Sequence, residues 1–277
     1  MKIPKDTVVA IFAYNRPSHL RRVLIALEDY RIYNNVVVYV DGPKNEKDEN
    51  CQKEIMLILN TKAKSEEIKI IRRKINLGLA NSILRGVDDL FKRFRKVIVL
   101  EDDCIPRKKF FEYTIDCLNF YENNKIISAV CAYQIPKLHS TTDKNLKTIF
   151  LNNFSSWGWS TWRDRWNEYK TGSVKKNIFN HNLISKIDKI VKNKKNIWTR
   201  DFMLHNYIKN KIYVFPNKSL VKNIGFDGSG INSKATYDFT TEYSPSKKII
   251  LSKKIEIDKN MNNVQERFIY KNLYQFY

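Results

Sequence analysis

The sequence predicts an α/β fold with a mainly parallel central sheet that helices cover on both faces. Four apolar segments of strand length occur in the first half of the chain, at residues 5–13, 35–40, 68–71 and 97–100. A helical pattern lies in each gap between them, and strands that alternate with helices are typical of parallel sheets buried on both faces. With 277 residues, 43% of them hydrophobic, the chain suits one large domain better than two.

The elements follow from local patterns. Pro17 suits the first turn of a helix, and Leu20, Val23, Leu24 and Leu27 follow it at helical spacing. The apolar periodicity predicts the remaining helices and strands. Helices are expected at 51–59, 80–94, 110–121, 182–191 and 199–208, and extended segments at 126–132, 148–154 and 212–221, the last broken by Pro216. We predict one domain over residues 1–245 and a basic C-terminal extension at 246–277.

The formal net charge of +21 has two open explanations. Ile, Lys and Asn are abundant along the whole chain, so the charge is explained equally well by composition bias. The other explanation is an anionic partner, and an anionic membrane surface is favoured over nucleic acid because clustered Lys and Arg bind anionic lipid. No segment reaches the ~20 apolar residues of a membrane span, and no signal peptide is apparent, so we expect a cytoplasmic location.

Polar residues follow three of the predicted strands: Tyr14-Asn15-Arg16, Asp41-Gly42 and Glu101-Asp102-Asp103. Ligands of open α/β sheets bind beyond the carboxyl ends of the strands, so the three groups are expected at one edge. Adjacent carboxylates repel one another unless a cation or hydrogen-bond donors neutralise them. Mg²⁺ or Mn²⁺, held by few carboxylates and by phosphate oxygens, fits this pattern. A solvated acidic turn is the alternative.

Other nucleotide, metal and nucleophile motifs are missing from the sequence. It has no G-x-G-x-x-G, no P-loop, no G-x-S-x-G and no H-E-x-x-H pattern. The four histidines are scattered, which disfavours a zinc site, and the four cysteines form no C-x-x-C pair.

Several segments together resemble GT-A glycosyltransferases, in the same order over residues 8–232. Within that class they resemble the animal alpha-mannosyl-glycoprotein beta-1,2-N-acetylglucosaminyltransferase family and bacterial relatives in surface polysaccharide synthesis. The segments are 8–27 (VVAIFAYNRPSHLRRVLIAL), 36–42 (VVVYVDG), 97–113 (VIVLEDDCIPRKKFFEY), 154–166 (FSSWGWSTWRDRW), 198–203 (WTRDFM) and 224–230 (IGFDGSG).

The resemblance implies a GT-A fold, with a donor half at about 1–125 and an acceptor half at about 126–245. It implies an inverting, Mn²⁺- or Mg²⁺-dependent transfer from a UDP-sugar, with UDP-GlcNAc as one candidate. The acceptor would be a growing surface glycan, lipid-linked in one version, and the basic tail would then hold the enzyme at the inner membrane face.

The resemblance also implies roles for residues of the donor half. Arg16, beside Tyr14 and Asn15, would contact the nucleotide or its phosphates, and Asp41 would hydrogen-bond the uracil. Glu101 and Asp102 would hold the nucleotide, with Asp102 at the ribose, and Asp103 would bind the metal. Asn76 and Gly78 would lie near the donor sugar, although the segment 76–79 is equally typical of a helix start.

The acceptor half has its own candidates. Asp201 would be the general base, but an N-terminal helix cap formed with Thr199 explains it equally well. Trp157, Gly158 and Trp159 would line a sugar or acceptor pocket, and the alternative for the tryptophans is core packing. Gly225, Gly228 and Gly230 have the composition of a mobile loop that closes over the donor. Ile231 and Asn232 stand where relatives often have a histidine, which puts a second metal or phosphate ligand in doubt.

Two rival functions stay open at this point. A sugar nucleotidyltransferase has a similar sheet, but it normally carries a Gly- and Arg-rich loop after the first strand. A basic nucleic-acid-binding protein is the rival from another class, but no such binding motif is visible.

Overall fold

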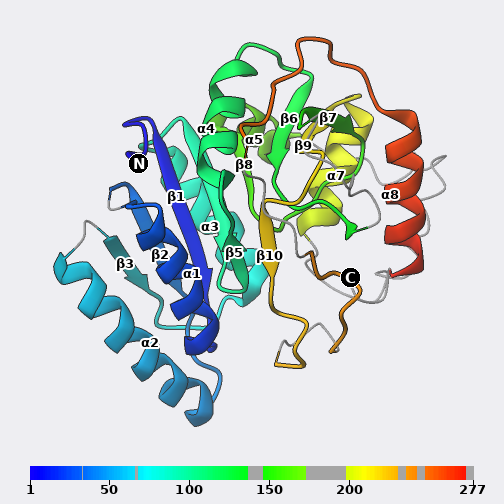
Figure 1. The fold of residues 1–277 in the computed structure, drawn as a ribbon. Coiled ribbons are helices and arrows are strands. Elements are labelled where there is room, and N and C mark those ends of the chain that lie inside the picture. The colour runs from blue at the N-terminus through cyan, green and yellow to red at the C-terminus, as the bar shows by residue number, and fades with distance from the viewer. Residues whose placement is uncertain are drawn as a thin grey trace.

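The computed structural model describes residues 1–32, 34–65, 68–136, 146–172, 198–229, 235–241 and 247–272. An eight-stranded sheet crosses the protein in the order β3-β2-β1-β4-β8-β6-β9-β7 (Figure 1). The short strands β5 (Cys104–Pro106) and β10 (Val221–Asn223) form a separate antiparallel pair. The observed architecture is the predicted α/β class, a central and mostly parallel sheet flanked by helices.

The first half of the sheet agrees with the sequence prediction. Strands β1 (Thr7–Ala13), β2 (Val36–Val40), β3 (Ile68–Arg72) and β4 (Lys96–Glu101) pair in parallel. Every residue of β1 and β2 is buried, as expected of strands covered on both faces. Because these four strands run in one direction, their carboxyl ends lie along one edge of the sheet.

The second half of the sheet mixes directions. β8 (Trp159–Trp162) runs antiparallel between β4 and β6 (Ile127–Cys131). β9 (Ile212–Pro216) pairs in parallel with β6, and β7 (Thr148–Leu151) closes the sheet antiparallel to β9. β9 ends at Pro216, where the break was expected. Sequence analysis did not predict β8, since its four residues alternate too briefly to show a strand period.

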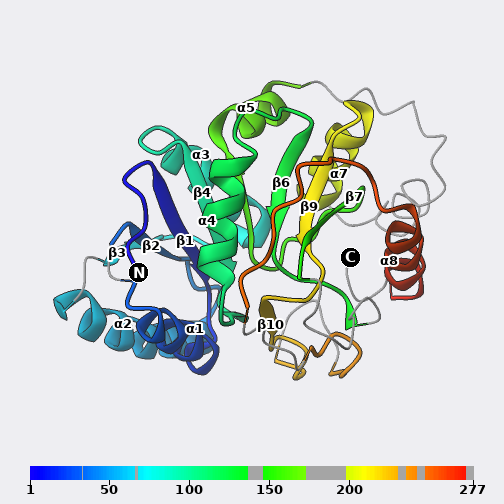
Figure 2. The same ribbon diagram turned by 45° about the horizontal axis from the view of Figure 1, so that its top comes forward.

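The helices cover both faces of the sheet (Figure 2). Alternate side chains of β1 show this directly, because Val9 and Ile11 belong to one core cluster and Val8 and Phe12 to the other. One face is covered by α1 (Pro17–Asp29), α2 (Glu46–Ser65) and α4 (Phe110–Phe120), and the other by α3 (Gly78–Phe91), α5 (Arg163–Thr171) and α7 (Trp198–Ile208). The predicted helix at 182–191 lies outside the described residues.

The C-terminal residues 247–272 pack against the domain. Ile250 forms an isolated bridge with Lys147, just before β7, and Ile257 forms one with Phe150 inside β7. α8 (Lys259–Lys271) follows. Phe268 and Ile269 of α8 are each 6% exposed and join the two core clusters. The Asp258 side chain caps α8 by accepting from the Met261 backbone N–H at 3.0 Å.

An aromatic cluster fills the core under α5 and α7. The Trp159 ring lies 5.4 Å from Phe154, 5.8 Å from Trp166 and 5.2 Å from Trp198, centroid to centroid. Each such pair contributes about 0.5–1.5 kcal/mol beyond simple area burial. Trp159 is 1% exposed. This places Trp159 in the packing of the core and not at the sugar pocket expected for it, because neighbouring rings cover it.

Candidate active site

The three polar groups that follow β1, β2 and β4 meet at one edge of the sheet, as predicted. The backbone N–H of Asp41 donates to the carbonyl of Ala13 at 3.0 Å, and the N–H of Asp102 donates to Phe12 at 2.9 Å. The parallel ladders thus continue past the strand ends. They fix the backbones of Asp41 and Asp102 on either side of the β1 end.

Arg16 joins the end of β1 to the acidic triplet. Its Nη2 lies 2.9 Å from Asp103 Oδ2 and also contacts Asp102 Oδ1. The side chain of Arg16 is 18% exposed, and those of Asp102 and Asp103 are 4% and 12% exposed. Burial alone would lower the pKa of Arg16, but the charges of Asp102 and Asp103 raise it above its usual value. The charged guanidinium of Arg16 therefore neutralises part of the negative charge of Asp102 and Asp103.

The remaining carboxyl of the triplet is in a different electrostatic state. Burial, with added repulsion from Asp103 and Asp102, raises the pKa of Glu101 to about 8. Burial also raises the pKa of Asp102, although the charge of Arg16 opposes that shift. Burial and mutual repulsion therefore both favour proton uptake by Glu101 and Asp102.

Asp48, in the first turn of α2, organises the other side of the β1 end. Its Oδ1 accepts from Asn15 Nδ2 at 2.7 Å, and its Oδ2 accepts from the Tyr14 hydroxyl and from the Lys44 backbone N–H at 3.1 Å. The Lys44 ammonium lies 5.7 Å from the centre of the Tyr14 ring. Asp48 is 5% exposed. It therefore fixes both Tyr14 and Asn15.

No pattern in the sequence indicates a role for Asp48 in the site. The segment Asn45-x-x-Asp48 has the spacing of a helix cap and its third residue, and the Asn45 side chain does accept from the Asp48 N–H at 3.0 Å. That signal locates the start of a helix. It says nothing of Tyr14, which only the fold brings to Asp48.

Replacement of Asp48 should loosen the site and the fold together. Asp48→Asn removes one of two acceptor oxygens from a buried position, so we expect a loss of about 1–3 kcal/mol in the free energy of unfolding at pH 7. Burial raises the pKa of Asp48, but hydrogen bonds from Tyr14 and Asn15 outweigh it and lower the pKa below its usual value. The native state thus binds fewer protons than the unfolded state near pH 4.

The stabilisation by Asp48 is therefore complete above about pH 4 and is lost as the pH falls through the lowered pKa. Urea unfolding of wild type and Asp48→Asn across this range measures it. Glu49→Gln, at an exposed position in the same turn, is the matched control and should change little. If the free energy of unfolding differs between wild type and Asp48→Asn by the same amount at every pH, this explanation is contradicted.

Asp41 ties the end of β2 to the start of α3. Its carboxylate accepts from the backbone N–H of Leu77 at 3.0 Å and of Gly78 at 2.9 Å, and Asp41 is 4% exposed. The Asn76 amide donates to the Gly42 carbonyl at 2.7 Å. A Cβ on Gly42 would lie 2.2 Å from a backbone atom of residue 75, so only glycine fits there. The predicted donor residues Asn76 and Gly78 are therefore adjacent to Asp41.

The glycine-containing loop after β10 covers the acidic triplet. The Ile224 N–H donates to the Asp103 carbonyl at 2.9 Å, and a Cβ on Gly225 would lie 2.2 Å from Asp103 Oδ2. Gly228 has φ +87°, which favours glycine. Asp227 Oδ2 lies 3.2 Å from His19 Nε2 on α1, a link that sequence analysis missed. Gly230 lies outside the described residues.

The donor set at this edge fits a divalent cation that phosphate oxygens complete. Among the described residues no three potential ligand side chains form a cage. Mg²⁺ usually takes one or two carboxylates from the protein and shares substrate phosphates. The loop approaches Asp103 Oδ2 so closely that a Cβ on Gly225 would lie 2.2 Å from it, and the guanidinium of Arg16 already contacts that oxygen.

Trp157 and Gly158 lie next to this loop. The Trp157 ring is partly buried and packs edge-on against Phe226 of the loop at 5.3 Å and against Tyr133 at 4.6 Å. Gly158 has φ +68°, and a Cβ there would lie 2.5 Å from the Val221 side chain. Trp157 is thus near the edge of the site, whereas Trp159 is in the core.

Asp201 lies in the first turn of α7. That helix is described from Trp198 onward, so Thr199 and Asp201 lie in its first turn, where a carboxylate also stabilises the N-terminus of a helix. Both alternatives for Asp201 therefore stay open here. The next element, β9, runs parallel to β6 and hence to β4, and its first residue is Ile212. The N-terminal turn of α7 therefore points toward the carboxyl edge. Asp201 is 48% exposed, and its Oδ1 accepts from Arg200 at 2.8 Å.

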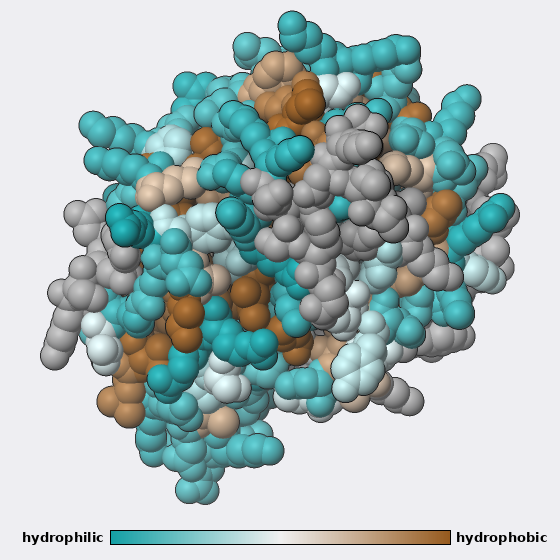
Figure 3. All heavy atoms as spheres, in the orientation of Figure 1, coloured by the Kyte–Doolittle hydropathy of each residue, from teal (hydrophilic) through white to brown (hydrophobic). Residues whose placement is uncertain are grey.

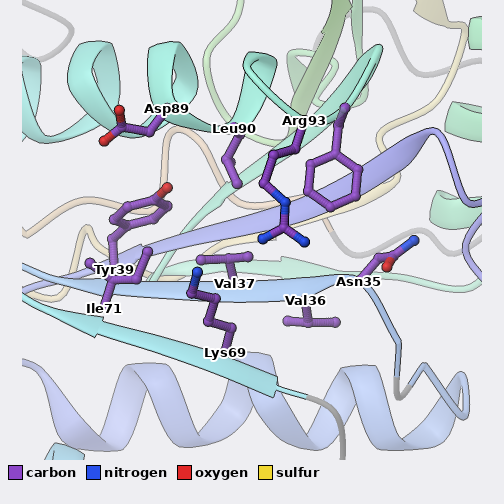
Figure 4. A pocket seen from close by; sticks show the side chains of 10 residues that line it. Asn35, Val36, Val37, Tyr39, Lys69, Ile71, Asp89, Leu90 and Arg93 are labelled. Carbon is purple, nitrogen blue, oxygen red and sulfur yellow. The ribbon is translucent and has the colours of Figure 1, made fainter.

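A separate hollow of about 200 Å³ lies between α3, β2 and β3, away from these residues. Figure 4 shows Lys69 extending from β3 and Arg93 extending toward the strands from the side of α3. None of the candidate residues lines it. The lining residues are Asn35, Val36, Val37, Tyr39, Lys69, Ile71, Asp89, Leu90, Arg93 and Phe94.

Comparison with family models decides the class of this protein. The model described as "Glycosyl transferase family 2" matches residues 8–180, which include β1, β2, β4 and the acidic triplet. The chain belongs to glycosyl transferase family 2. As a family 2 glycosyltransferase with this sheet and these helices, it has the GT-A fold. Membership selects the transferase over the nucleotidyltransferase and the nucleic-acid-binding protein.

Three solved structures resemble this family 2 glycosyltransferase distantly, and no curated protein matches its sequence. Glucosyl-3-phosphoglycerate synthase from Mycobacterium tuberculosis, in complex with Mn²⁺, UDP and glucosyl-3-phosphoglycerate, has TM-score 0.34 and 11% identity. The match covers 57% of each chain. The 4-diphosphocytidyl-2C-methyl-D-erythritol synthase of Anaerococcus prevotii has TM-score 0.39 and 12% identity, over 76% of this chain and 88% of that one. A197 from STIV has the same two values, over 91% and 98%.

Proposed function

We propose that this glycosyltransferase moves a sugar from UDP to a glycan acceptor, and that the donor binds at the edge formed by Arg16, Asp41 and Asp102. The observation that carries the proposal is the acidic pair Asp102 and Asp103 at the end of β4, held by Arg16 and covered by the loop at Gly225. Such an edge offers a cation and carboxylates to one ligand, which suits a nucleoside diphosphate that carries both ribose hydroxyls and phosphates.

The parts of the donor are distributed over three strand ends in this proposal. Asp41, fixed by Leu77 and Gly78, accepts from the uracil, and Asp102 accepts from a ribose hydroxyl. Arg16 binds phosphate through guanidinium N–H groups, which match phosphate oxygens in geometry and charge. Asp103 holds Mn²⁺ or Mg²⁺, which offsets the charge of the departing diphosphate when it is bound.

Asp201 acts on the acceptor in this proposal. Its carboxylate takes the proton of the acceptor hydroxyl as that oxygen bonds to the anomeric carbon, while the bond from that carbon to the UDP oxygen breaks. Attack opposite the leaving group inverts the configuration. The free space at Asp201 supports this role, since its side chain is half exposed and has one oxygen engaged with Arg200.

The specific donor and acceptor follow only from the resemblance. Surface glycan relatives favour UDP-GlcNAc or another UDP-hexose as donor and a lipid-linked glycan as acceptor. Release of UDP from a panel of UDP-sugars, measured with Mn²⁺ and with EDTA, tests the proposal. We expect hydrolysis of one or two UDP-sugars that depends on the metal. If no UDP-sugar is hydrolysed but the sugar nucleotide of another base is, uridine is the wrong nucleotide.

An anionic membrane surface is the proposed location of the acceptor. Hydrophilic residues dominate the face shown in Figure 3, and among the described residues no helix is both long and apolar enough to cross a membrane. Lys247 and Lys253 belong to a basic stretch in which Lys248 pairs with Asp116 and Lys254 with Glu256. We expect sedimentation with anionic vesicles at low salt and release at high salt. Equal sedimentation with neutral vesicles would leave composition bias as the explanation.

A further inference from the structure

Arg16 contacts the oxygen that the proposed metal needs. Its Nη2 lies 2.9 Å from Asp103 Oδ2, and the other oxygen of Asp103 is 3.4 Å from the Cys104 thiol, a weak donor. Asp103 is thus held chiefly by an arginine from another element, 87 residues away in sequence. A cation that binds this oxygen competes with a positive charge already in place.

The two carboxylates differ in how they are held. Asp102 contacts Arg16 through Oδ1 and accepts from the Tyr14 backbone N–H at 3.3 Å through Oδ2. Departure of Arg16 therefore frees Oδ1 of Asp102 and Oδ2 of Asp103, while Asp102 keeps a backbone donor and Asp103 keeps only the weak thiol donor of Cys104. The Asp103 side chain is 12% exposed and that of Asp102 is 4% exposed, so Asp103 is the more accessible ligand of the two.

Arg16 also has unused donors. Both of its described contacts with carboxylates use Nη2, and neither Nη1 nor Nε has a hydrogen-bond partner among the described side chains of this edge. An arginine fork can bind a phosphate group through two parallel N–H bonds. A diphosphate therefore gives Arg16 a second anionic partner beside the first.

We propose that Arg16 is a built-in counter-ion that blocks Asp103 from metal until the diphosphate of the donor draws the guanidinium away. The inference rests on the proposed function of this edge. It makes nucleotide and divalent cation bind cooperatively, because each lowers the repulsion that the other meets. The divalent cation alone binds weakly, because Arg16 occupies the oxygen of Asp103 that it needs. The position of Arg16 thus makes the nucleotide bind before the metal.

Titration of the free Mn²⁺ signal by electron paramagnetic resonance tests this on the whole chain, with and without UDP. Wild type should bind Mn²⁺ alone weakly and at least ~100-fold more tightly with UDP, within the range that coupled ligands reach. Arg16→Gln, which removes the charge, should bind Mn²⁺ alone at least ~10-fold more tightly than wild type and show less coupling to UDP. Arg16→Lys keeps the charge and should bind Mn²⁺ alone as weakly as wild type.

Arg21→Gln, at an exposed position of the same helix, is the control and should match wild type. Circular dichroism establishes that each variant is folded. A folded Arg16→Gln protein that binds Mn²⁺ alone no more tightly than wild type would overturn the counter-ion role. If wild type does not bind UDP at all, the proposed function is overturned instead. The two failures can be told apart because the comparison of Mn²⁺ binding by wild type and Arg16→Gln is made without UDP.

Discussion

Asp103→Asn should reduce sugar transfer by about 10³-fold, because it removes the carboxylate that holds the proposed metal on the diphosphate. A metal contributes several kcal/mol to stabilising charge in such reactions, and each 1.36 kcal/mol is tenfold in rate. Thermal unfolding separates this effect from misfolding. UDP should raise the melting temperature of wild type, and more so with Mn²⁺, while in Asp103→Asn the increment from Mn²⁺ should disappear.

The control for Asp103→Asn is the same substitution at Asp116, a carboxylate outside the candidate site that pairs with a lysine. Asp116 on α4 pairs with Lys248 at 2.8 Å, and Asp116→Asn should keep both the activity and the metal increment. Stabilisation of wild type by UDP that is the same in EDTA and in Mn²⁺ would refute the metal site. The family and the fold do not depend on that result.

Asp201→Asn should lose transfer by ~10²-fold or more while it melts near wild type and binds UDP with similar affinity. The amide cannot take the acceptor proton, yet it has nearly the size of the carboxylate. The ion pair that it loses, with Arg200, is half exposed, and such pairs contribute about 0–1 kcal/mol. Initial rates with the true acceptor, beside UDP affinity, measure the two effects.

α5 offers a closely matched control for Asp201. Asp164 is in the first turn of that helix, is 50% exposed and pairs with the next residue, Arg165, at 2.8 Å. It differs from Asp201 in that it also pairs with Lys125 at 2.6 Å. It follows β8, whose last residue pairs with Lys96 at the start of β4, so it lies at the opposite edge of the sheet. Asp164→Asn should keep full activity. A fully active Asp201→Asn enzyme would exclude Asp201 as the base.

The sequence predicts the first half of this fold well for a physical reason. β1, β2 and β4 are buried on both faces, so each is an apolar run that needs no partner to be recognised. β8 is different, because its tryptophans and hydroxyl residues are buried only through packing with distant segments such as α7. The helix at the C-terminus was hidden in the same way, since its two core residues lie among lysines and asparagines.

The site shows the same limit. Arg16, Asp41 and the acidic triplet were found because each follows an apolar strand, and parallel strands bring such residues together. The identity of the partner was not predictable, since the expected cation was a metal and the structure shows Arg16 on Asp102 and Asp103. Asp48 and the contact between His19 and Asp227 join helices to loops, and no local pattern indicates such pairs.

The central claim is that a uridine diphosphate binds at the edge formed by β1, β2 and β4, and calorimetric titration with UDP in Mn²⁺ tests it most directly. We expect one UDP site in wild type and unchanged UDP affinity in Arg93→Gln. Asp102→Asn should bind UDP at least ~10-fold more weakly, because it loses the ribose acceptor and part of the ion pair with Arg16. Arg93 lines the separate hollow between α3, β2 and β3. Binding that Arg93→Gln abolishes and Asp102→Asn leaves intact would contradict the account.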